Sequence, residues 1–201
     1  MKPKIPEFGN LPPELKSAIN ISNYEQVLCP PKELLFRAFY QHPLEDTKIV
    51  IIGSEPYTEP LAANGLAFGI GKGYGPGLSF VHPSSLLLNA VKKETESLNT
   101  DVSLLPWAKQ GVLLLNLRLS GMVNQPGAHK DLGWEQLMVD FLKELDYYRK
   151  SKVYLLWGPE ARALDSELDH KTNLVLCSDQ PSGFNLANDY LERRGRTPII
   201  W

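Results

Sequence analysis

One turn of the chain brings together side chains that could bind a flat ring and act on it. Residues 48–52 form a short apolar run, and the turn that follows reads Gly-Ser-Glu-Pro-Tyr from Gly53 to Tyr57. It carries the Glu55 carboxylate and the Tyr57 ring, and a second ring, Phe68, follows in an apolar Leu-Ala-Phe segment. Open α/β sheets usually bind ligands at the carboxyl ends of their strands. The turn therefore predicts a pocket with a carboxylate and two aromatic rings on its wall.

Glu55 is the candidate for chemistry within this turn. A carboxylate near an anomeric carbon can stabilise an oxocarbenium-like transition state and orient the attacking water, as it does in glycoside hydrolysis. The alternative is a turn residue at the surface. Because Glu is an unusual choice between Ser and Pro at the end of a strand, we favour a functional carboxylate.

Four apolar runs of strand length must position this turn and its neighbours. They are rich in Val, Ile and Leu without polar alternation, which is typical of strands covered on both faces. They span residues 48–52, 111–116, 152–157 and 173–177. Helical patterns lie at residues 85–96, 133–148 and 160–168, and a proline-started helix is expected at residues 32–39. This alternation predicts a parallel α/β sandwich, in one domain over residues 1–201.

A polar loop with Gly or Pro follows each predicted strand. These loops span residues 53–57, 124–130, 158–160 and 178–184. Because parallel strands end at the same edge of a sheet, we expect the four loops to converge on one site. The glycines at residues 69–77 match neither a dinucleotide fingerprint nor a P-loop, so we expect no phosphate cradle there and no cofactor.

Composition excludes several classes of protein. The formal net charge is −2, so any contact with nucleic acid must be local. Basic segments at residues 92–93, 149–152 and 193–196 are candidates, although each could equally be a solvated surface. Cys29 and Cys177 are too few for a disulfide framework or a thiolate metal site, and we expect both to be buried. The chain shows no signal peptide, and no apolar run approaches the roughly 18 to 20 residues of a membrane span, so we expect a soluble, intracellular protein.

Three further blocks carry a resemblance to a known family. Residues 107–116 read WAKQGVLLLN, residues 129–136 read HKDLGWEQ, and residues 155–158 read LLWG. With the turn at Gly53, their order and spacing resemble the motifs of family 1 uracil-DNA glycosylases. The resemblance implies a three-layer α/β sandwich around a central four-stranded parallel sheet. It also implies hydrolysis of the N-glycosidic bond of deoxyuridine flipped out of single- or double-stranded DNA, by a monomer without a cofactor.

The resemblance also implies roles for the residues around the base. Glu55 would act near the sugar, and Gln180 would donate a hydrogen bond to uracil O2. Asn116 would read the base edge, Phe68 would stack on the base, and Tyr57 would exclude the methyl group of thymine. The alternatives are an Asn that bonds its own backbone and aromatic rings that belong to the core.

A second group of residues would contact the DNA strand. The resemblance implies that hydroxyls and nearby backbone amides hold phosphates and that an apolar side chain wedges into the duplex. The phosphate contacts would come from Ser84, Ser85, Ser182 and Gly183, and the wedge would be Phe184.

The two positions that do most of the chemistry in the family both depart from its pattern, in which the first turn reads Gly-Gln-Asp-Pro-Tyr-His and the last loop reads His-Pro-Ser-Pro-Leu. Glu55 replaces the Asp and Gln180 replaces the His. A catalytic group displaced by about 1 Å can cost on the order of 10²-fold in rate, and loss of one donor to a developing anion costs roughly 10²–10³. Ser54 and Thr58 are milder changes, because backbone amides at that turn can still contact the base.

Two functional classes follow from this pattern. The first is a working, slower glycosylase, which the retained Tyr57, Phe68, Asn116 and Ser182 favour. The second is a catalytically silent relative that binds uracil-containing or distorted DNA, or a replication or repair protein, which the two changed positions favour. An enzyme for another base is disfavoured because Tyr57 blocks substituents at C5. We favour activity on uracil.

Overall fold

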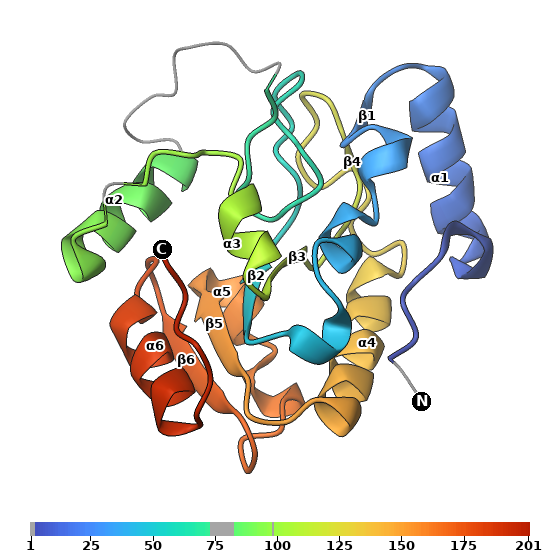
Figure 1. Ribbon diagram of the computed structural model, residues 1–201. Helices are drawn as coiled ribbons and strands as arrows, with labels where there is room; N and C mark the ends of the chain where they lie inside the picture. Colours follow the sequence, from blue (N-terminus) through green and yellow to red (C-terminus); the bar gives the residue numbers. More distant parts are fainter. Residues whose placement is uncertain (1–2, 73–82, 98) are drawn as a thin grey trace.

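The computed structural model describes residues 3–72, 83–97 and 99–201, and a four-stranded parallel sheet lies at its centre (Figure 1). The strands, in spatial order, are β3 (Val112–Asn116), β2 (Ile49–Gly53), β5 (Val153–Trp157) and β6 (Leu174–Ser178). Every neighbouring pair is parallel. The four predicted strands are confirmed to within one residue at each end.

Burial explains why these strands read as continuous apolar runs. Every residue of β2, β3 and β5 is buried, so both faces of each strand need apolar side chains. β6 pairs with β5 alone, and its residues are half-buried or exposed because it forms an edge of the sheet.

Helices cover both faces of the sheet and complete the predicted three layers. α2 (Pro83–Thr95) and α6 (Phe184–Arg193) lie together on one side, while α1 (Pro13–Tyr24) and α4 (Trp134–Tyr148) lie on the other (Figure 1). The short α3 (Leu105–Lys109) precedes β3, and α5 (Gly158–Arg162) follows β5 directly. A small antiparallel pair, β1 (Leu28–Cys29) with β4 (Gly121–Met122), packs beside α1.

Two predicted helices are wrong in extent. Residues 32–39 form two 3-10 helices, Lys32–Leu34 and Arg37–Tyr40, because the backbone at Phe36 leaves the helical region (ψ 13°). Residues 160–168 divide into the end of α5 and the 3-10 helix Asp165–Glu167. The apolar spacing was misleading in both cases, because buried side chains at three- and four-residue intervals also arise from successive short turns. The remaining 3-10 helices are Phe8–Asn10 and Leu44–Asp46.

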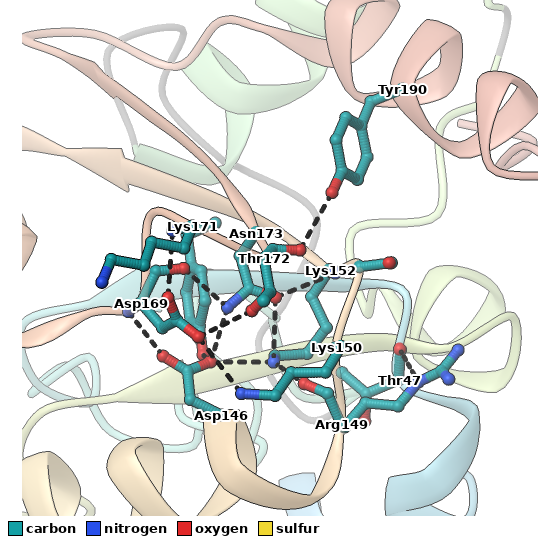
Figure 2. Close-up of polar contacts among 12 residues, drawn as sticks. Thr47, Asp146, Arg149, Lys150, Lys152, Asp169, Lys171, Thr172, Asn173 and Tyr190 are labelled. Atoms are coloured by element: carbon teal, nitrogen blue, oxygen red, sulfur yellow. Dashed lines mark hydrogen bonds and ion pairs between the residues drawn. The ribbon is translucent and has the colours of Figure 1, made fainter.

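A buried polar network fastens α4 to the amino end of β5 (Figure 2). Oδ1 of Asp146 accepts hydrogen bonds from Lys152 Nζ at 2.8 Å, Tyr154 Oη at 2.6 Å and Asn173 Nδ2 at 3.0 Å. Lys152 is fully buried, and burial lowers the pKa of its ammonium group against the opposing effect of Asp146. The prediction that Lys152 belongs to a basic surface segment is therefore wrong.

The two cysteines differ in their surroundings. Cys29 is buried as predicted, and burial, together with the charges of Glu55 and Glu59, raises the pKa of its thiol to about 12. Cys177 is exposed, so the prediction of burial is wrong for this residue, which lies on the edge strand β6. Within the described ranges, no helix is both long enough and apolar enough to cross a membrane.

Candidate active site

A cavity of about 210 Å³ lies at the carboxyl ends of β2, β3 and β5. Its wall contains the predicted carboxylate, both predicted rings and the predicted amide. The site residues that line it are Ser54, Glu55, Tyr57, Phe68 and Asn116, together with Trp157. The carboxyl ends of three neighbouring strands thus meet at one site, as expected of a parallel sheet.

Gly53 allows the Asn116 side chain to stand at the inner wall of the cavity. The two residues are paired in register at the ends of β2 and β3. A Cβ atom on Gly53 would lie 2.3 Å from Asn116 Oδ1 and 3.4 Å from Phe68 Cε2, so only glycine fits there. Among the described residues the Asn116 amide has no hydrogen-bond partner, although the residue is only 9% exposed. A nearly buried amide without a protein partner is positioned to bind a polar ligand.

Phe68 and Trp157 form an aromatic side of the cavity. Their rings meet edge to face, with centroids 5.6 Å apart. Phe68 has a positive φ of 63°, a conformation that costs a non-glycine residue roughly 1–3 kcal/mol. The Phe68 carbonyl accepts hydrogen bonds from Ser84 Oγ at 2.6 Å and from Tyr57 Oη at 3.4 Å. These bonds stabilise the backbone conformation of Phe68. Trp157 was not predicted as a site residue, although its place at the end of an apolar strand gave the same signal as Asn116.

Tyr57 presents its ring to the cavity while its hydroxyl points to Ser84, 2.8 Å away. Burial raises the pKa of this hydroxyl well above its usual value, so it stays neutral. Ser84 is itself buried and directs its hydroxyl inward, whereas Ser85 beside it is half-buried. Ser84 was predicted to contact phosphate, but in this structure its hydroxyl bonds Tyr57 and the Phe68 carbonyl.

Glu55 is held by two partners at the rim of the cavity. Both carboxylate oxygens accept the Gly127 N–H, at 3.1 Å each, and Oε2 lies 3.4 Å from Arg118 Nε. The side chain of Glu55 is 21% exposed. Gly127 lies in the loop after β4, within the polar loop predicted at residues 124–130. Its hydrogen bond to Glu55 confirms that this loop reaches the site.

Arg118 is the main site residue that the sequence did not reveal. Its buried guanidinium also binds Glu135 at 3.1 Å and Glu160 at 2.8 Å. Burial would lower its pKa, but the hydrogen bonds of Glu160 and Glu135 and the charge of Glu55 outweigh burial and raise it. One cation therefore holds three carboxylates, from the turn after β2 and from the first turns of α4 and α5. The available signal was a single charge within the apolar run after Asn116.

The loop before α6 differs from its predicted role at two residues. Gln180 is exposed and does not line the cavity. Phe184, predicted as a wedge into DNA, is fully buried, with its ring 5.6 Å from that of Trp157 and 5.1 Å from that of Trp201. The wedge prediction is thus wrong for this structure, because the C-terminal Trp201 closes over the ring. The exposed apolar side chain at this end of α6 is Leu186.

A carboxylate from α2 occupies the amino end of α6. Glu94 accepts the N–H groups of Gly183 at 2.9 Å and Phe184 at 2.8 Å. These amides are the ones predicted to hold phosphate with Ser182, whose hydroxyl lies 2.9 Å from Ser178 Oγ. An acidic side chain at a helix amino end is electrostatically favourable. Glu94 was not predicted for this site.

Comparison with known proteins places these features in a family. No protein-family model matches the chain. The uracil-DNA glycosylase of Ureaplasma parvum serovar 3 is 39% identical, over 93% of this chain and 91% of the relative. That of Bacteroides thetaiotaomicron is 37% identical, over 90% and 86%. The crystal structure of mimivirus uracil-DNA glycosylase superposes with a TM-score of 0.81 at 22% identity, over 94% of this chain and 80% of that one. The structure supports the shared fold, and the sequence relatives establish the family.

Proposed function

The chain belongs to the uracil-DNA glycosylase family, and we propose that it hydrolyses the N-glycosidic bond of deoxyuridine flipped out of DNA, a step of base excision repair. The observation that carries this proposal is the cavity in which the unpartnered Asn116 amide, the Phe68 ring and the Glu55 carboxylate meet. The protein acts as a monomer through a single domain, and its substrate is single- or double-stranded DNA that contains uracil.

Base recognition relies on shape and on one amide. Asn116 can donate to uracil O4 and accept from N3–H, a pattern that cytosine does not present. Phe68 stacks on the base, and the Tyr57 ring fills the space beside C5, where thymine carries a methyl group. The neutral hydroxyl of Tyr57 stays bonded to Ser84, so the ring is fixed in this position.

The chemistry then requires a negative charge near the sugar. Bond cleavage leaves positive charge on the sugar and negative charge on uracil, and the Glu55 carboxylate stabilises the first and orients the attacking water. Because Gln180 lies outside the cavity, the leaving uracil is stabilised by Asn116 and by backbone amides of the turn from Ser54 to Tyr57.

Arg118 compensates for the extra methylene of Glu55. A Glu side chain has more rotamers than an Asp, and its carboxylate needs additional partners to stay within catalytic tolerance. Gly127 N–H and Arg118 Nε provide these partners. Since Arg118 also binds Glu135 and Glu160, the cluster of one guanidinium and three carboxylates retains a net negative charge. This charge favours a cationic sugar in the transition state.

A second candidate function is binding without hydrolysis. The exposed Gln180 and the occupation of the α6 amides by Glu94 favour it, because both remove interactions that the family pattern implies. In that case the protein would bind uracil-containing DNA or a repair partner and release no base.

Uracil release from a single-stranded, uracil-containing oligonucleotide tests the proposal. We expect the wild type to release uracil and Glu55→Gln to lose on the order of 10²-fold or more in kcat. Glu59→Gln is the matched control, since Glu59 is a nearby carboxylate that does not line the cavity, and it should retain activity. Absence of release by the wild type, with retained binding to the oligonucleotide, would establish the second candidate instead.

A further inference from the structure

A second hollow, of about 480 Å³, lies at the opposite edge of the sheet from the candidate active site. We call it the basic cleft, and its charged lining residues are Lys48, Lys109, Arg149, Arg196 and Asp46. Lys48 directly precedes β2, Lys109 ends α3 just before β3, and Arg149 follows α4 just before β5. Four cations from three connections and the C-terminal segment therefore face one space that contains a single carboxylate.

Three of the four cations of the basic cleft donate hydrogen bonds to neutral oxygen atoms. Arg149 Nε donates to the Thr47 carbonyl at 3.2 Å (Figure 2), Arg196 donates to the carbonyls of Thr47 at 3.0 Å and Ser151 at 3.1 Å, and Lys48 Nζ donates to a hydroxyl. None of the four forms an ion pair with a carboxylate in the part of the chain that the structure describes.

Neighbouring lysines behave differently. Lys150 binds Asp169 at 3.1 Å, and Lys152 binds Asp146 at 2.8 Å, as Figure 2 shows. The chain thus pairs the cations immediately beside Arg149 with carboxylates but leaves those of the basic cleft without one. Positive charge is therefore concentrated in this cleft of a protein whose net charge is −2.

The unpaired cations repel one another. Burial and then the nearby charge of Arg149 lower the pKa of Arg196 to about 10. Burial and then Arg196 lower the pKa of Lys48. His42, also on the wall, adds no charge near neutral pH, because burial lowers its pKa and both ring nitrogens have partners. An anion in the cleft would relieve this repulsion.

We propose that the basic cleft binds a ligand that carries two or more phosphate groups. Four cations against one carboxylate call for a multivalent anion. The terminal nitrogens of Arg149 and the Lys109 ammonium have no hydrogen-bond partner among the described residues, and the Nε–Thr47 bond fixes the orientation of the guanidinium fork. Such a fork binds phosphate oxygens in pairs, and a flexible ammonium supplies a second point charge. The phosphates come either from a free nucleotide or polyphosphate or from the backbone of a nucleic-acid strand.

Calorimetric titration with pyrophosphate at fixed ionic strength tests this assignment. We expect one saturable site in the wild-type chain, with binding weakened about tenfold or more in Lys109→Glu. Lys109 is exposed and makes no contact that the fold needs. Lys171→Glu is the matched control, because Lys171 is an exposed lysine outside the cleft, and it should bind like the wild type. Arg149→Lys keeps the positive charge but loses the planar guanidinium. Its affinity for pyrophosphate should lie between those of the wild type and Lys109→Glu.

Two outcomes would overturn the proposal: no saturable binding by the wild type, or equal binding by Lys109→Glu and the wild type. Competition then separates the sources of phosphate. Displacement of pyrophosphate by a uracil-free single-stranded oligonucleotide indicates backbone phosphates, whereas displacement by a nucleoside triphosphate alone indicates a free ligand. Uracil release by Lys109→Glu should equal that of the wild type. A loss of pyrophosphate binding in this variant would then not reflect a defect in the candidate active site.

Discussion

The two edges of the central sheet carry opposite charge. At the carboxyl edge, one guanidinium, Arg118, is surrounded by Glu55, Glu135 and Glu160. At the amino edge, four cations line the basic cleft with the single carboxylate of Asp46. The same three strands, β2, β3 and β5, connect the two sites, and the net charge of −2 conceals both.

Helix direction accounts for much of this difference. Helices that follow parallel strands begin at the carboxyl edge, where their positive ends favour acids, and they end at the amino edge, where their negative ends favour cations. Glu135 and Glu160 lie in the first turns of α4 and α5, while Lys109 ends α3 and Arg149 caps α4. A helix end supplies only about half a charge, however, so it cannot balance a cluster of three or four like charges. The excess at each edge is available for a ligand.

Removal of Arg118 should have the largest effect. Arg118→Ala leaves three carboxylates without their cation, and we expect a loss of about 2 kcal/mol in the free energy of unfolding, below the roughly 3–5 of a fully buried pair because the carboxylates are partly exposed. The kcat for uracil release should fall about 10²-fold, since Glu55 loses its orientation. Urea unfolding and steady-state kinetics measure the two effects.

Two control variants separate the effect of Arg118 on the orientation of Glu55 from its effect on the stability of the fold. Arg118→Lys should recover most of the stability and only part of kcat, because an ammonium cannot hold three carboxylates in one plane. Arg162→Ala removes an exposed cation that pairs with Asp179, and it should cost little in either measurement. An Arg118→Ala protein with wild-type kcat would show that the acid cluster does not position Glu55.

A methyl group on Gly53 should come next in effect. In Gly53→Ala the new Cβ would lie 2.3 Å from Asn116 Oδ1, so the amide must move, and we expect kcat/KM for uracil release to fall about 10²-fold with a smaller loss of stability. Gly121→Ala is the control, because its Cβ meets only Cys29 Sγ, at 3.6 Å. Equal activity in the two variants would mean that the position of Asn116 does not depend on this contact.

The strands and the composition of the pocket could be predicted from sequence for a simple physical reason. A strand buried on both faces must be apolar throughout, so a polar residue at its end or just beyond it is conspicuous, as are Asn116 and Glu55. Parallel strands then bring those ends together without further information. Gly53, Tyr57 and Phe68 follow from the same local signal.

The partners that come from distant segments could not be predicted in this way. Phe184 has the sequence context of a surface loop, but its burial depends on Trp157 and Trp201. Arg118 gains its role only when the first turns of α4 and α5 reach it. Lys152 becomes a core residue because Asp146 lies opposite on another helix. Local sequence does not encode these contacts between distant segments, because they depend on how the layers pack.

Glu94 extends the acidic edge to the loop that was predicted to hold phosphate. We expect Glu94→Gln to bind single-stranded DNA several-fold more tightly, with a salt dependence steeper by about 0.7 in log–log slope, because one more phosphate can reach the α6 amides. Glu96→Gln removes the same charge from an exposed neighbour and should leave the slope unchanged. Weaker binding in Glu94→Gln would instead mean that the carboxylate holds the loop in the shape that DNA requires. Fluorescence anisotropy over a range of salt concentrations measures both quantities.

Acid titration should show the smallest effect, and at the carboxyl edge. Burial would raise the pKa of Glu160, but hydrogen bonds from Arg118 and Ser54 outweigh it and lower the pKa below the usual 4.5. The unfolded chain therefore binds a proton at higher pH than the folded protein does. The resulting stability is present above about pH 4.5 and is lost as the pH falls through the folded value. Glu160 is 38% exposed, so we expect this contribution to be about 1 kcal/mol or less.

Urea unfolding from pH 6 to pH 3 tests this contribution. Glu160→Gln should flatten the decline of stability with acid, whereas Glu192→Gln, an exposed carboxylate on α6, should not. If both variants follow the wild-type curve, the pKa of Glu160 is the same in the folded and the unfolded chain, and its contact with Arg118 adds no pH-dependent stability. If Glu160→Gln alone flattens the curve, the Glu160 carboxylate is ionised beside Arg118 in the folded protein. The negative field that the proposed hydrolysis requires is then present before any substrate binds.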